Sequence, residues 1–204
     1  RESFWGRVGV GEIDDIEAAI SWLESEGLAS ADSIFITGAS YGGFLTLLAL
    51  GKLPERIAGG LAHVAQADWV AAYPQMNPAL QTAWRGFVGS DPTIDPTPWQ
   101  EASPISYVEH VRAPAWLNQG AFDTRTPPEQ AQRYAGAIAE EAMASASAGA
   151  KSVKSSGGSG RRVTQKAITD HTTATVVGGL VAAFREEARI AIGEAEGDRE
   201  ILSG

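Results

Sequence analysis

Residues 33–51 read SIFITGASYGGFLTLLALG, and the fold can be predicted outward from them. Its first five residues are rich in β-branched and aromatic side chains, and an apolar run follows at residues 44–50, so the pattern predicts a strand, a tight turn and a helix. The turn itself, residues 38–42, reads GASYG. A G-x-S-x-G turn between a strand and a helix bends the backbone so sharply that the serine hydroxyl stands above the sheet edge. Ser40 is therefore a candidate nucleophile.

The surroundings of Ser40 support this interpretation, although a glycine-rich loop whose serine is merely small remains an alternative. A phosphate-binding loop is disfavoured, because apolar residues 44–45 stand where that motif has a Lys-Ser/Thr pair. We expect the crowding of the turn to fall on Gly38 and Gly42. The following helix directs its N–H groups toward negative charge near the turn, which makes the Tyr41 N–H a candidate oxyanion donor.

Length and composition indicate one globular domain. A chain of 204 residues buries roughly 70% of its unfolded surface, and 44% hydrophobic with 20% charged residues is ordinary. The net charge of −9 argues against nucleic acid or an anionic membrane as a partner and favours a neutral or cationic substrate. With no cysteine and three histidines, the sequence indicates neither a zinc site nor another cofactor. The longest apolar segment, residues 173–184, is too short to span a membrane.

The remaining periodic segments predict an α/β fold. Apolar residues recur at helical spacing over residues 13–23, and Gly27 is a plausible C-cap. Residues 57–64 and 115–119 are expected to form a second and a third buried strand. Strands separated by helices form parallel βαβ units, so we expect a mostly parallel sheet with helices on both faces.

Residues 65–99 form a long excursion that we expect to be irregular, with five prolines and three tryptophans. In α/β folds such an excursion usually lies over the carboxyl edge of the strands, where ligands bind. Its aromatic residues are candidates for a substrate pocket, namely Trp69, Tyr73 and Trp84, with Phe87 beside them. The alternative is that they form a small core of their own.

Asp123 follows the third predicted strand and is the candidate acid. Because the carboxyl ends of parallel strands meet at one edge, its carboxylate is expected on the same side as Ser40. Asp123 can also be read as an N-terminal helix cap or as a partner for Arg125.

A serine nucleophile needs an imidazole to accept its proton and a carboxylate to orient that imidazole. His63 and His110 are more easily read as structural histidines. His171 follows Asp123 in the chain, which gives the order Ser40, Asp123, His171 that this fold imposes on its triad. His171 is therefore the predicted base.

The C-terminal third differs in composition. Residues 141–166 are rich in Ala, Ser, Gly and Lys, which predicts a flexible linker after a helix that ends near residue 142. We accordingly expect a core at residues 1–140, this linker, and a histidine loop with a helix at residues 167–204.

Several short motifs together resemble one known family. They are Phe4-Trp5-Gly6, Asp14-Asp15, the turn at residues 38–43, Ser103-Pro104-Ile105, and Gly120-x-x-Asp123-x-Arg125-x-Pro127 followed by Gln130. Over residues 1–140 the sequence resembles the catalytic domain of the prolyl oligopeptidase family of serine peptidases. The resemblance implies an α/β-hydrolase domain that cleaves short peptides or acyl-peptides, with Ser40 as nucleophile and Asp123 as acid, often joined to a β-propeller.

Two departures from the family pattern bear on activity. The family has several further strands before the first helix, and their loop supplies a second oxyanion donor; the resemblance thus implies a hydrolase domain without its first strands. The family also has a Gly-His-Gly-like signature where this sequence has Asp170-His171-Thr172. A small-ester carboxylesterase, or an inactive homologue that serves as an interaction module, remain the alternative functions.

Overall fold

The computed structural model describes residues 5–155, and the surroundings of side chains for residues 5–145. All of these residues belong to the first of two compact units, Arg1–Gly158. The elements are, in chain order, α1 (Gly11–Ser25), β1 (Phe35–Ala39), α2 (Tyr41–Lys52), β2 (Gly59–His63), α3 (Trp69–Ala72), the 3-10 helix η1 (Tyr73–Gln75), α4 (Pro78–Val88), α5 (Thr97–Ala102), the 3-10 helix η2 (Pro104–His110), β3 (Ala115–Asn118) and α6 (Pro128–Ser155).

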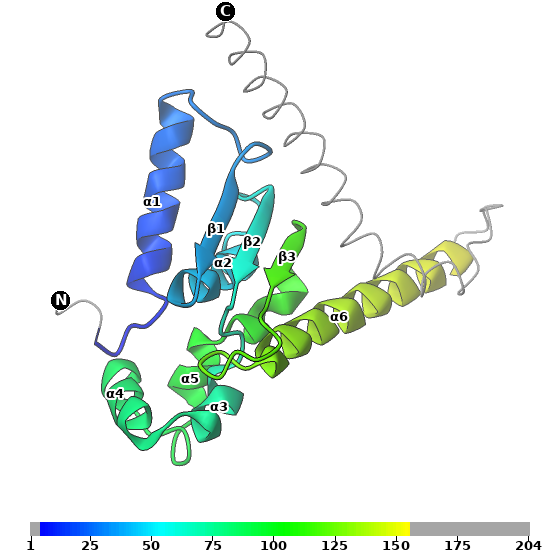
Figure 1. Cartoon of the computed structure of the whole chain (residues 1–204). Helices are drawn as coiled ribbons and strands as arrows, with labels where there is room; N and C mark the ends of the chain where they lie inside the picture. The colour runs from blue at the N-terminus through cyan, green and yellow to red at the C-terminus, as the bar shows by residue number, and fades with distance from the viewer. Residues whose placement is uncertain (1–4, 156–204) are drawn as a thin grey trace, which may run out of the picture. The chain divides into compact units, whose positions relative to one another are not determined.

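The sheet has the predicted parallel arrangement. Its strands follow the order β1-β2-β3, and Ile36 pairs with Gly60, which in turn pairs with Ala115. All three strands therefore end at one edge. Helices α3, α4 and α5 lie beyond that edge (Figure 1), as expected for the excursion between the second and third strands.

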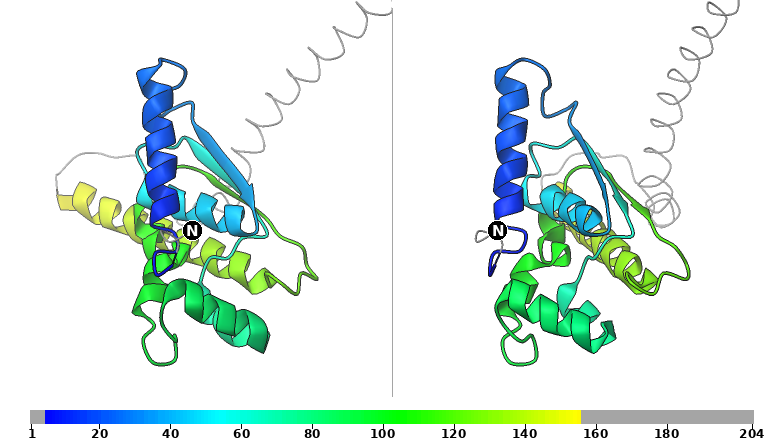
Figure 2. Two further views of the ribbon diagram at one scale, coloured as in Figure 1. Left: turned by 90° about the vertical axis from the view of Figure 1, so that its left-hand side faces the viewer. Right: turned by 60° about the vertical axis from the view of Figure 1, so that its left-hand side comes forward.

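Helix α2 is the centre of the core. It packs between α1 and the strands (Figure 2), and its apolar side chains Phe44, Leu47, Leu48 and Leu50 are almost completely buried. The approach is so close that a Cβ on Gly60 of β2 would lie 2.7 Å from Leu50 Cδ1. A glycine in the strand is thus what lets this helix lie against the sheet.

Helix α1 ends as its sequence predicts. Gly27 has a φ of +67°, its N–H donates to the Glu24 carbonyl, and the Leu28 N–H donates to the Leu23 carbonyl. This pair of bonds is a Schellman motif, in which glycine adopts the left-handed conformation at low cost.

The expectation of an irregular excursion at residues 65–99 is wrong, because much of it is helical. Asn77 is the N-cap of helix α4, and its side chain accepts a hydrogen bond from the Leu80 N–H at 2.9 Å; the C-cap is Gly89, with a φ of 88°. The N-cap Asn, Pro78 in the first turn and the terminal glycine are standard helix boundaries. Prolines therefore lie in the first turns of η1, α4 and α5 rather than interrupting a helix.

The expected end of the last helix near residue 142 is also wrong. Helix α6 continues to Ser155, so the first part of the predicted linker at residues 141–166 is helical. Alanine has the highest helix propensity, and it recurs through residues 142–150, which offsets the absence of a strong apolar stripe. The division of the chain beyond this helix stays a prediction.

Candidate active site

Ser40 occupies the turn between β1 and α2 in a strained conformation, with φ 56° and ψ −116°. A non-glycine residue at positive φ costs roughly 1–3 kcal/mol and persists only where its surroundings hold it. Here the Ser40 N–H donates to the His63 carbonyl at 2.9 Å, and the Ser40 carbonyl accepts from the Phe44 N–H at 2.9 Å. The residue is exposed, as a nucleophile on such a turn has to be.

At this turn the backbone packs so closely that Gly38 and Gly43 have no room for a side chain. A Cβ on Gly38 would lie 2.4 Å from both the carbonyl carbon and the oxygen of Gly42, and one on Gly43 would lie 2.6 Å from the His63 oxygen. By contrast, a Cβ on Gly42 would meet no atom within 4 Å. The prediction that Gly42 is sterically required is therefore wrong: its backbone is the obstacle, and Gly38 is the residue that must be small.

Tyr41 is the first residue of α2 and is tied to α1 through its side chain. Its hydroxyl donates to Glu12 Oε1 at 2.5 Å, and Glu12 Oε2 accepts from the Gly9 N–H at 3.1 Å. Burial, together with the hydrogen bond to Glu12, raises the pKa of the Tyr41 phenol well above its ordinary value. The backbone that follows Ser40 is thus anchored to a second helix.

Ser40 lies at a cavity of about 420 Å³ that also has Trp69 and Trp84 in its wall. The two indole rings are 4.1 Å apart between centroids, and Trp69 packs edge-on against Phe44. Trp69 and Trp84 therefore belong to a small aromatic core and also form part of the cavity wall, whereas a role in substrate binding stays a prediction. Tyr73 does not line this cavity; it is buried and packs against the Trp99 ring at 5.1 Å.

Asp123 stands in the loop between β3 and α6. Its Oδ1 accepts hydrogen bonds from the N–H groups of Arg125 at 2.8 Å and Thr126 at 2.9 Å. These backbone donors, that of Thr126 first, lower the pKa of the Asp123 carboxyl below its ordinary value. The loop that the carboxylate orders, residues 124–127, lines the same cavity as Ser40. The structure thus brings the loops of the two candidate residues to one cavity.

Two of the three histidines, His63 and His110, lie within the residues that the structure describes. His63 Nδ1 is 3.1 Å from the Asn118 amide nitrogen, and His110 lies 3.4 Å from a Glu109 carboxylate oxygen. Within residues 5–155 neither imidazole is hydrogen-bonded to Ser40 or Asp123. The predicted base, His171, lies outside the described residues.

The sequence analysis assigns no role to two glutamines near the site, although Gln130 follows one of the family motifs. Gln66, in the loop after β2, is 8% exposed and lines the cavity beside Ser40. Gln130 of α6 is fully buried, and its Oε1 accepts from the N–H groups of Ala67 at 3.1 Å and Asp68 at 2.9 Å. Gln130 therefore holds the loop that carries Gln66. A buried amide has no periodic signature, so only its contacts reveal this role.

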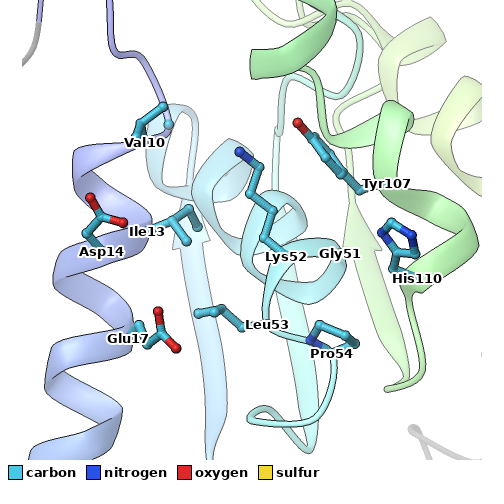
Figure 3. Close-up of a pocket in the computed structure, with 11 residues that line it drawn as sticks. Val10, Ile13, Asp14, Glu17, Gly51, Lys52, Leu53, Pro54, Tyr107 and His110 are labelled. Carbon is cyan, nitrogen blue, oxygen red and sulfur yellow. The ribbon is translucent and has the colours of Figure 1, made fainter.

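A second cavity, of about 510 Å³, lies between α1, the end of α2 and η2 (Figure 3). Lys52 places its Nζ 4.8 Å from the centre of the Tyr107 ring. The carboxylates on the α1 side already have partners, since Asp14 pairs with Arg7 at 3.6 Å and Glu17 pairs with Arg56 at 3.5 Å. None of the residues predicted for the active site lines this cavity.

Among the described residues there is no cluster of three or more His, Cys, Asp or Glu side chains suited to a metal ion. Over the same part of the chain, no helix has the length and apolar character needed to cross a membrane.

The sequence profile of the prolyl oligopeptidase family matches residues 1–153. The chain belongs to this family. The resemblance to the prolyl oligopeptidase family that was drawn from the sequence motifs is therefore confirmed.

The chain aligns with only a small part of each of two curated relatives. Dipeptidyl peptidase family member 6 of Caenorhabditis elegans is 28% identical over 133 residues, which is 61% of this chain and 17% of the relative. Acylamino-acid-releasing enzyme 2 of Oryza sativa subsp. japonica is 28% identical over 152 residues, which is 68% of this chain and 19% of the relative. The chain thus spans less than a fifth of the length of these two relatives.

Solved structures agree with the family assignment. A puromycin hydrolase is 27% identical with a TM-score of 0.63, over 69% of this chain and 21% of that protein. An acylaminoacyl peptidase of Pyrococcus horikoshii is 25% identical with a TM-score of 0.61, over 68% of this chain and 22% of that protein. The parallel sheet and its helices are accordingly part of an α/β-hydrolase fold, as the sequence predicts.

Proposed function

We propose that this chain is the nucleophile-bearing part of a serine peptidase that cleaves short peptides or acyl-peptides. The observation that carries the proposal is the strained, exposed Ser40 at a cavity with an aromatic wall, into which the Asp123 loop also extends. Family membership favours a peptidase, and acyl-peptides are favoured by the names of the acylamino-acid-releasing relatives.

In the proposed reaction, His171 accepts the Ser40 hydroxyl proton as Oγ forms a bond to the substrate carbonyl carbon. The Tyr41 N–H stabilises the negative oxygen of the tetrahedral intermediate, which then collapses to an acyl-enzyme as the leaving amine takes the proton from His171. Water repeats the sequence and releases the acid. Asp123 orients the imidazole and stabilises its charged form. His171 is assigned this role by chain order alone, since the triad of this fold runs Ser, Asp, His.

The parent protein is proposed to contain more than this chain, because the curated relatives are several times longer. A further N-terminal segment of the hydrolase domain, or a β-propeller that restricts access to the site, is the proposed partner of the described fold. Removing a single oxyanion donor lowers the catalytic rate constant by a factor of about 10² to 10³. We therefore expect full activity only when a second donor is supplied by that segment.

Labelling with a fluorophosphonate probe tests the proposal. The full-length parent protein is expected to be labelled, and Ser40→Ala and His171→Ala are expected to abolish labelling, whereas His63→Ala and His110→Ala are expected to retain it. Lack of labelling of the full-length parent protein, or labelling that survives Ser40→Ala, would refute the nucleophile assignment. Turnover of aminoacyl anilides in preference to short-chain nitrophenyl esters distinguishes a peptidase from a carboxylesterase.

A further inference from the structure

The second cavity, of about 510 Å³, has charges of opposite sign on its two sides. Asp14 and Glu17 line it from α1, and Lys52 lines it from the last turn of α2. Figure 3 shows the Lys52 ammonium on one side of the cavity and the two carboxylates on the other, with Ile13 and Leu53 drawn between them. The proposed peptidase mechanism uses none of these groups.

The Lys52 ammonium has no acidic partner in the part of the chain that the structure describes. Its Nζ lies 4.8 Å from the centre of the Tyr107 ring, and the ion pairs found within residues 5–145 do not include it. The aromatic ring and the negative end of the α2 dipole both favour a cation at this position. Neither contact replaces a carboxylate as an acceptor for the three N–H donors of the ammonium. A ligand carboxylate would therefore find a charged donor on this side of the cavity.

The carboxylates on the α1 side are paired but accessible. Asp14 is 3.6 Å from Arg7 and Glu17 is 3.5 Å from Arg56, and the two acidic side chains are 67% and 51% exposed. Ion pairs that are this exposed contribute little to stability. A carboxylate also has about four lone-pair sites, so it can accept from a ligand ammonium while it keeps its arginine partner.

The surface between the charged groups is apolar. Val10 is 40% exposed and Pro54 is partly exposed, and both line the cavity together with Ile13 and Leu53. A cavity of this volume is within the usual range for binding an organic ligand. An apolar ligand body can therefore lie between the acidic and the basic side.

The arrangement of charges restricts the class of ligand. A ligand with only a negative charge would lie beside two carboxylates, and one with only a positive charge would lie beside Lys52. A single amino acid carries both charges on one carbon, whereas here they come from two packed helices, whose axes are typically about 8–10 Å apart. We propose that the second cavity binds a short zwitterionic peptide with apolar side chains, its ammonium at Glu17 and its carboxylate at Lys52.

Calorimetry with the full-length parent protein carrying Ser40→Ala tests this proposal without turnover. The ligands are leucyl-leucine, its N-acetyl form, its C-terminal amide and glycyl-glycine. Leucyl-leucine is expected to bind about tenfold more tightly than each of the other three, which lack the positive charge, the negative charge or the apolar side chains. Absence of leucyl-leucine binding, or equally tight binding of any of the other three, would overturn the proposal.

Substitutions assign the two ends of the ligand. Lys52→Met keeps the apolar stem and is expected to weaken leucyl-leucine binding about tenfold while leaving the affinity for the C-terminal amide unchanged. Glu17→Gln is expected to do the same with respect to the N-acetyl form. Asp15→Asn is the matched control, because Asp15 is an exposed carboxylate of α1 that does not line the cavity. Undiminished binding of leucyl-leucine to Lys52→Met, or an equal effect of Asp15→Asn and Glu17→Gln, would contradict the assignment.

This inference is independent of the proposed function. The binding experiment uses a protein without the Ser40 hydroxyl, so its outcome does not depend on whether Ser40 is a nucleophile. Fluorophosphonate labelling of the unsubstituted parent protein without leucyl-leucine binding would refute the second site alone.

Discussion

Gly38→Ala should be one of the most damaging small substitutions in this protein. The new Cβ would lie 2.4 Å from the Gly42 carbonyl carbon and oxygen, and 2.9 Å from its Cα. Ordinary contact begins near 3.4 Å, so 3.4 Å less 2.4 Å leaves a deficit of 1.0 Å. Both atoms belong to the backbone of the turn that holds Ser40, so no side-chain rotation can relieve the overlap.

The expected cost follows from this geometry. Overpacking by a methyl group typically costs about 1–3 kcal/mol, and we expect the upper end of that range because strand and helix must separate. For a chain of this size, a loss of about 3 kcal/mol corresponds to a fall in Tm of roughly 6–12 °C. Gly42→Ala is the matched control: its Cβ has open space, and alanine is favoured over glycine in a helix by about 0.5–1 kcal/mol. It should leave stability unchanged or slightly increased.

Urea unfolding of the full chain, followed by circular dichroism, measures both variants. The reasoning predicts a lowered midpoint for Gly38→Ala alone, accompanied by loss of fluorophosphonate labelling because the turn is displaced. If Gly38→Ala unfolds at the wild-type midpoint, or if Gly42→Ala is equally destabilising, then the close approach of strand and helix is not what makes Gly38 necessary.

Three further predictions concern the surroundings of the site. Tyr41→Phe removes the hydrogen bond to a half-buried Glu12 carboxylate and should lower the unfolding free energy by about 1.5–3 kcal/mol, while Glu12→Gln, which keeps an acceptor, should cost less in the same urea titration. Gln130→Leu leaves two N–H groups at residues 67–68 without their acceptor and should cost about 2–5 kcal/mol by thermal and urea unfolding; wild-type stability would show that the bonds contribute nothing. The lowered pKa of the Asp123 carboxyl means that its ionised form stabilises the fold above about pH 4, and this contribution is lost as the pH falls through the folded pKa. Asp123→Asn, which retains the Oδ1 acceptor, should therefore show a smaller loss of stability on acidification, measured by urea unfolding from about pH 6 to about pH 3; an unchanged pH dependence would contradict this account.

The course of the backbone could be predicted well where neighbouring residues encode it. The strand, turn and helix around Ser40 and the terminus at Gly27 depend on dihedral preferences and apolar spacing within a few residues, and both are found. The helices of the excursion at residues 65–99 are also encoded, by the Asn77 cap and by Gly89, although the five prolines of this segment favour an irregular structure. The extent of α6 is harder to predict, because its low-complexity composition is typical of a linker while its alanines favour a helix.

The residues alone are enough to predict the family, the parallel α/β arrangement, and a serine at the turn and an acid after β3. The folded structure was needed to show that Gly38 rather than Gly42 must be small, that Trp69 and Trp84 reach the Ser40 cavity while Tyr73 packs against Trp99, and that Gln66 lines the cavity. The difference arises because local pattern specifies dihedral angles and amphipathic faces. Which residues meet across a sheet edge depends on the packing of segments far apart in the chain, and this packing cannot be predicted from a short-range pattern.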